Sequence, residues 1–75
     1  MNRSVEIDVE WDGEAGVWIA ASPEIGLFTE AETLDDLRRR VAVIASDLLE
    51  DKVPQGTRLH LELRVRFDEV LPAAA

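Results

Sequence analysis

The carboxylates are the residues of this chain whose type and spacing best fit a catalytic site. Asp8 and Glu10 lie two positions apart near the N-terminus, and Asp35, Asp36 and Asp47 lie in a later segment. Several acids that converge on two metal ions are the machinery of a metal-dependent nuclease. An ordinary surface uses the same residues as solvated or ion-paired charge. The choice depends on whether the elements that carry the two groups can bring them together.

Other catalytic chemistry has little support in the sequence. The chain has no cysteine, which excludes a thiolate zinc site and a cysteine nucleophile. Its one histidine, His60, alternates with leucines and is expected on the wet side of a strand. A single imidazole without a second ligand predicts no metal centre. We therefore expect a chain that is not an enzyme, with no catalytic residue, no metal and no cofactor.

Length and charge restrict the remaining functions. The chain has 75 residues, which predicts a single domain over residues 1–75. Sixteen acids against eight bases give a net charge of −8, and residues 1–37 contain ten acids and one base. Phosphate contacts need clustered Lys and Arg, so we expect no direct nucleic-acid binding. The acidity suits a basic protein partner, although it also serves simple solubility.

The N-terminal half predicts three strands in series. Val5, Ile7, Val9 and Trp11 alternate with polar residues, which is typical of a strand with one buried face. A glycine-containing turn over residues 12–16 leads to a return strand over residues 17–22. After the turn at residues 23–26, residues 27–31 predict a short strand at the edge of the sheet.

The second half predicts a helix and one more strand. Thr33 is a good N-cap, and the apolar residues from Leu34 to Leu48 follow helical spacing. The helix should end near residues 50–52, before Pro54. Residues 58–67 alternate regularly between apolar and polar, which predicts the fourth strand. The tail over residues 68–75 lacks periodicity and is expected to be loose.

This order of elements, β-β-β-α-β, predicts an α+β fold with a four-stranded mixed sheet and one helix on one face. A right-handed crossover delivers the fourth strand parallel to the first, in the spatial order 3-2-1-4. That order sets the acids of the first strand beside the bases of the fourth, which is favourable. Asp8 then lies on the face opposite the helix, so the two groups of carboxylates do not meet.

The second strand is apolar on both faces. We assign Val17, Ile19 and Ala21 to the core, which sends Trp18 and Ala20 outward. An exposed tryptophan on a sheet face predicts an interface. With the opposite assignment, Trp18 would join the core. The two edge strands also offer unpaired backbone groups, and strand addition along the fourth would give a dimer.

The stretch from Trp11 to Leu37 combines a glycine turn over residues 12–16, a strand from Val17, a Pro-Glu-Ile-Gly-Leu segment from Pro23 and a threonine-capped helix. In this order the features resemble the HicB-like antitoxin superfamily, above all its short stand-alone bacterial members, over roughly residues 4–67. The resemblance implies a truncated ribonuclease H-like layer. It also implies a role in neutralising a small basic toxin that cleaves messenger RNA.

The chain also departs from the resemblance. No helix-turn-helix or ribbon-helix-helix pattern follows the last strand, so operator binding is not expected. The turn before the third strand carries Ile25 before Gly26 where the family often has Pro-Gly.

Three hypotheses about function follow. The first is an acidic, cytoplasmic binding module that occludes a basic RNA-cleaving toxin, its carboxylates taking the place of RNA phosphates. The second is a self-associating protein, a homodimer or higher oligomer without a toxin. The third is a metal-dependent nuclease. For the first, we expect partner contacts at Glu6, Asp8, Glu10, Trp18, Glu24 and Glu30.

Overall fold

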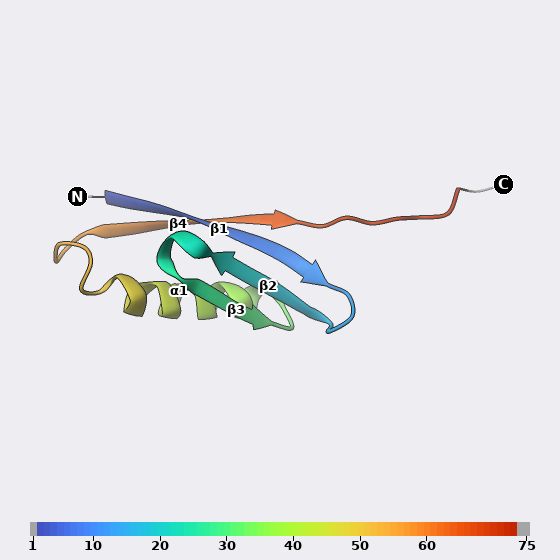
Figure 1. Ribbon diagram of the computed structural model, residues 1–75, viewed down its shortest axis with the longest axis horizontal. Coiled ribbons are helices and arrows are strands. Elements are labelled where there is room, and N and C mark those ends of the chain that lie inside the picture. Colours follow the sequence, from blue (N-terminus) through green and yellow to red (C-terminus); the bar gives the residue numbers. More distant parts are fainter. Residues whose placement is uncertain (1, 74–75) are drawn as a thin grey trace.

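A single helix packs on one face of a four-stranded sheet in the computed structural model, which describes residues 2–73 (Figure 1). The sheet has the strand order β3-β2-β1-β4, with β1 parallel to β4 and antiparallel to β2. The predicted α+β fold and strand order are therefore confirmed. The elements are β1 (Asn2–Asp12), β2 (Val17–Ser22), the short 3-10 helix η1 (Pro23–Ile25), β3 (Leu27–Ala31), α1 (Leu34–Leu49) and β4 (Arg58–Arg66).

The β1–β2 hairpin turns through a loop of four residues that Asp12 stabilises. One carboxylate oxygen of Asp12 accepts hydrogen bonds from the backbone N–H groups of Glu14 and Ala15, at 3.1 and 3.2 Å. Asp12 thus forms an Asx-type turn, which is common at loop starts. Gly16 closes the loop with φ = 69°, a conformation that glycine adopts without steric penalty. The loop brings Asp12 opposite Val17 and so sets the register of the hairpin.

Helix α1 begins where its sequence predicts. The side chain of Thr33 accepts a hydrogen bond of 3.1 Å from the backbone N–H of Asp36, which satisfies one of the free donors of the first turn. The helix packs against β3, β2 and η1. Its fully buried side chains join those of β1, and the shared core contains Val5, Ile7, Val9, Leu37, Val41, Ala45 and Leu49.

The faces of β2 are the reverse of our prediction. Val9 lies opposite Ala20 and Trp11 lies opposite Trp18, and residues opposite each other in an antiparallel pair share a face. Ala20 is fully buried against the helix side, as is Ser22. Trp18 therefore faces the helix side, and Val17, Ile19 and Ala21 face away from it. Both faces of β2 are apolar, so alternation alone could not distinguish them.

The molecule is elongated, with principal extents of 59 × 20 × 20 Å. Its radius of gyration is 15.1 Å, whereas a compact chain of this length would have about 11 Å. The excess comes from β4 and from residues 67–73, which continue beyond the sheet without regular secondary structure (Figure 1). The predicted loose tail extends further, to residues 74–75, which lie outside the described residues. No helix in residues 2–73 is long and apolar enough to cross a membrane.

Candidate functional site

The face of the sheet away from α1, which we call the open face, carries most of the residues expected to bind a partner. Two rows cross it from β4 to β3. One row reads Arg66, Glu10, Ile19 and Glu30. The next reads Arg64, Asp8, Ala21 and Phe28. The positions of both rows on β4 and β1 are charged, the positions on β2 are apolar, and β3 contributes Glu30 to one row and Phe28 to the other.

An apolar patch occupies the β2–β3 half of the open face. We define it as Val17, Ile19, Ala21 and Phe28. The first three are half-buried by their neighbours, and Phe28 is 67% exposed. A phenylalanine this exposed has no role in the core, and it lies directly opposite Ala21 on the adjacent strand. The patch is therefore an apolar surface on the β3 side of the open face, next to charged residues.

Three exposed carboxylates flank this patch, and we call Asp8, Glu10 and Glu30 the acidic rim. Asp8 and Glu10 lie on β1 beside the patch, and Glu30 lies on β3 opposite Ile19. Within residues 2–73, the structure records no ion pair for any of the three. Their charges are therefore available to a partner.

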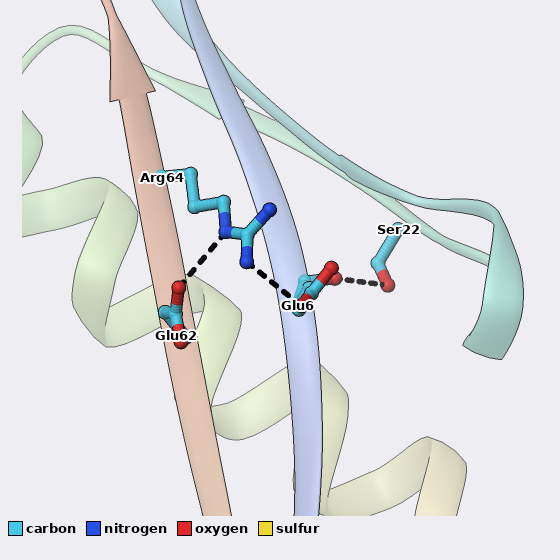
Figure 2. Close-up of polar contacts among 4 residues, drawn as sticks. All are labelled: Glu6, Ser22, Glu62 and Arg64. Atoms are coloured by element: carbon cyan, nitrogen blue, oxygen red, sulfur yellow. Dashed lines mark hydrogen bonds and ion pairs between the residues drawn. The ribbon is translucent and has the colours of Figure 1, made fainter.

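Glu6 is on the same face but is already engaged (Figure 2). Nη2 of Arg64 donates a 2.8 Å hydrogen bond to Glu6, and Nε of Arg64 donates another of 2.8 Å to Glu62. The hydrogen bond and the positive charge of Arg64 lower the pKa of Glu62 below its usual range. The bond to Glu62 and the nearby carboxylates raise the pKa of Arg64. This cluster stabilises the β1–β4 pair and leaves Glu6 less free than the acidic rim.

The remaining two expected contacts lie elsewhere. Glu24 is in η1, in the turn between β2 and β3, and pairs with Arg3 at 3.2 Å. Trp18 is on the helix side, where its ring centroid lies 5.1 Å from that of Trp11 and 6.0 Å from that of Phe67. Trp18 packs against the core, so its predicted outward orientation is wrong and the argument for an interface role from an exposed tryptophan no longer applies.

Phe28 is the residue of this surface that the sequence analysis missed. The register of the β1–β2 hairpin would have predicted its position. With Val9 and Trp11 inward and a loop of four residues, Trp18 and Ala20 must also face inward. Ala21 and its neighbour Phe28 are then placed on the open face.

The carboxylates do not assemble into a metal centre. Among residues 2–73, no group of three or more His, Cys, Asp or Glu side chains lies close enough to hold a metal ion. Asp35 and Asp36 are instead on α1, where they form ion pairs of 3.9 and 2.7 Å with Arg38 and Arg39. This arrangement does not favour the nuclease hypothesis.

The fold and the open face define a small α+β domain with a solvent-exposed, mixed apolar and acidic sheet surface. Residues 4–70 match the family model "Domain of unknown function (DUF1902)", and the chain belongs to this family. A solved structure, the hypothetical protein TTHA1013 from the extremely thermophilic bacterium Thermus thermophilus, is 40% identical with a TM-score of 0.65. That comparison covers 95% of this chain and 100% of the other. A comparison with curated proteins gave no match.

Proposed function

We propose that this chain is a protein-binding module whose open face binds a small basic protein. The observation that carries the proposal is the exposed Phe28 in an apolar patch between carboxylates that form no ion pair within residues 2–73. Protein interfaces combine an apolar centre with a polar rim, and aromatic residues dominate their binding energy. The open face has this composition.

The charge of the chain favours a basic partner. A net charge of −8 attracts a basic protein during encounter and raises the rate of association at low salt. The acidic rim would then form ion pairs with the Lys or Arg residues of the partner, around apolar contacts made by the patch. Salt should weaken such binding, because exposed charges are screened within about 10 Å at 0.1 M ionic strength.

The resemblance to HicB-like antitoxins suggests what the basic partner is. A small toxin that cleaves messenger RNA must present basic groups to RNA phosphates. Carboxylates of the acidic rim would occupy these groups and exclude the RNA. The mechanism is occlusion, and it needs neither a catalytic residue nor a metal or cofactor in this chain.

A pull-down from the native lysate tests the proposal, with the tagged full chain as bait at low and at moderate salt. We expect a small basic protein, retained at low salt and weakened at moderate salt, whose RNA cleavage is inhibited by the bait. The matched variant, with Asp8→Asn, Glu10→Gln and Glu30→Gln together, should retain its fold and lose most of this binding. Equal retention by this variant would contradict a role for the acidic rim.

Self-association is a second candidate, because one strand edge of the sheet is long and open. Strand β4 pairs with β1 along one side, and no strand in residues 2–73 lies on its other side. Edge strands of this kind pair readily with another chain. The native mass of the purified chain distinguishes a monomer of 8.4 kDa from a multiple of that mass.

A further inference from the structure

Strand β4 is a long edge strand that pairs with β1 on one side and, within residues 2–73, is open on the other. Its nine residues, Arg58–Arg66, all pair with β1 in a parallel register from Asn2 to Glu10. The backbone N–H and C=O groups that point away from β1 face the open edge of the sheet. A long, unprotected edge is uncommon in a monomer, because it recruits other strands.

The helix-side face of β4 is an incompletely covered apolar row. Leu59, Leu61 and Leu63 are half-buried, whereas Val65 is 50% and Phe67 is 53% exposed. Helix α1 packs mainly over β3 and β2, and the core that it shares with the sheet reaches Leu59, Leu61 and Leu63 but leaves Val65 and Phe67 largely uncovered. The row alternates with charged residues, so a neighbouring strand could cover it only in certain registers.

We propose that β4 pairs antiparallel with β4 of a second copy of this chain, with the two-fold axis at Leu63. The two sheets then form one continuous sheet of eight strands, with both helices on the same face. The inference rests on the self-association candidate above and is independent of the basic partner. In this register Leu63 lies opposite Leu63 of the second copy, and the other opposed pairs are Leu61 with Val65, Leu59 with Phe67, Glu62 with Arg64, His60 with Arg66 and Arg58 with Asp68.

The charges select this register over its neighbours. An axis at Glu62 or at Arg64 would place that residue opposite its own copy. An axis at Leu61 would place Arg58 opposite Arg64, and an axis at Val65 would place Arg64 opposite Arg66. Like charges directly opposite one another destabilise a strand pair, and opposite charges stabilise it. Only one of these five registers, the one centred on Leu63, places Glu62 opposite a base and places no two arginines opposite each other.

The bonds within each chain are compatible with this pairing. Arg64 already bonds Glu62 at 2.8 Å, and Arg66 bonds Asp68 at 3.2 Å. Both pairs lie on the open face of the sheet. In the dimer, the two Glu62–Arg64 pairs would lie side by side across the axis and form one network of four charges.

The same register gives the C-terminal segment a place to bind. Residues 69–71 would run beside residues 55–57 of the second copy. These border a groove at the end of α1, lined in part by Leu49, Val53, Pro54 and Leu59. Val70 is 94% and Leu71 is 76% exposed in the single chain. In Figure 1 this segment and the loop between α1 and β4 lie at opposite ends of the molecule, as an antiparallel dimer requires.

Cysteine cross-linking tests the register directly, because the chain has no cysteine of its own. Leu61→Cys, Glu62→Cys, Leu63→Cys, Arg64→Cys and Val65→Cys are prepared singly in the full chain and oxidised under the same conditions. Opposed residues have Cα atoms roughly 4.5–5.5 Å apart, within the range that a disulfide spans. We expect Leu63→Cys to form the linked dimer at least ~10-fold faster than the other four.

Two controls keep the outcomes distinct. Wild-type chain in sedimentation equilibrium should have twice the mass of 8.4 kDa. A monomer there would refute both self-association and this dimer. A dimer whose fastest cross-link lies at another position, or at none of the five, would refute the dimer proposed here and leave self-association standing. An equimolar mixture of Glu62→Cys and Arg64→Cys should yield mainly the mixed disulfide.

Discussion

Replacing Trp18 by alanine is the sharpest test of how β2 faces the core. In the structure Trp18 is half-buried on the helix side and contacts the rings of Trp11 and Phe67. Truncating a fully buried tryptophan costs about 3–5 kcal/mol, so a half-buried one should cost about 2 kcal/mol. A domain of 75 residues is typically stable by about 4–11 kcal/mol. Trp18→Ala should therefore remove a substantial part of the total stability.

The expected loss corresponds to a decrease in Tm of roughly 8–16 °C for a domain of this size. Far-UV circular dichroism during thermal unfolding measures it, at one fixed protein concentration because self-association would also shift Tm. The matched control is Phe28→Ala. Phe28 is 67% exposed on the open face, so this change should alter stability by less than about 0.5 kcal/mol. An unchanged Tm for Trp18→Ala with a large decrease for Phe28→Ala would show that the faces of β2 are inverted.

Three further predictions concern single side chains. Ser22 is buried and its hydroxyl donates a 2.8 Å hydrogen bond to a backbone carbonyl of β1, so Ser22→Ala should lower the urea-unfolding free energy by about 1 kcal/mol. Thr33→Ala removes the helix N-cap and should also cost about 1 kcal/mol, and an unchanged urea midpoint would contradict the cap. The lowered pKa of Glu62 means that its pairing with Arg64 stabilises the fold at neutral pH and is lost as pH falls through that pKa. In a carboxyl NMR titration, Arg64→Gln should return the pKa of Glu62 to its usual range, and no change would exclude Arg64 as the cause.

The fold was predictable because separate signals agreed on it. The alternation along β1 and β4 gave their buried faces, and Thr33 and Pro54 delimited the helix. The right-handed crossover predicted the strand order and charge complementarity supported it, and the Glu6–Arg64 bond of 2.8 Å lies in the predicted β1–β4 pair. Local pattern and global topology reinforced one another, as expected of a natural sequence.

The candidate site was predictable only in part, because it depends on the faces of β2. Asp8 and Glu10 were assigned to the correct face of the sheet, since their polar positions alternate with buried valine and isoleucine. Val17 to Ala21 is apolar at every position, and hydrophobicity therefore carried no information about direction. The hairpin loop fixed the direction through its length. This single register placed Trp18 on the helix side and Phe28 on the open face, and so moved the aromatic residue of the candidate interface from β2 to β3.

The same limitation affected α1 slightly. Its buried residues include Ala45 and Leu49, whereas Ile44 and Leu48 are only half-buried and Leu34 is 41% exposed. The apolar stripe of α1 is wide, so the position of the helix over the sheet determines which of its residues are the most buried. Ile44 lies toward β3, where it lines a shallow hollow with Thr29 and Val43, whereas the buried Leu49 lies near Leu59 of β4.

One comparison of affinities tests most directly the proposal that the open face binds a basic protein. Phe28→Asp places a charge within the apolar patch, and Val43→Asp makes the same kind of change at a residue of α1 that is 62% exposed. Both are measured by calorimetric titration against the basic protein captured in the pull-down. We predict that Phe28→Asp weakens binding at least ~10-fold, the loss typical of an aromatic interface residue, and that Val43→Asp binds as the wild type does. Full affinity of Phe28→Asp, or an equal loss in both variants, would contradict binding through the open face.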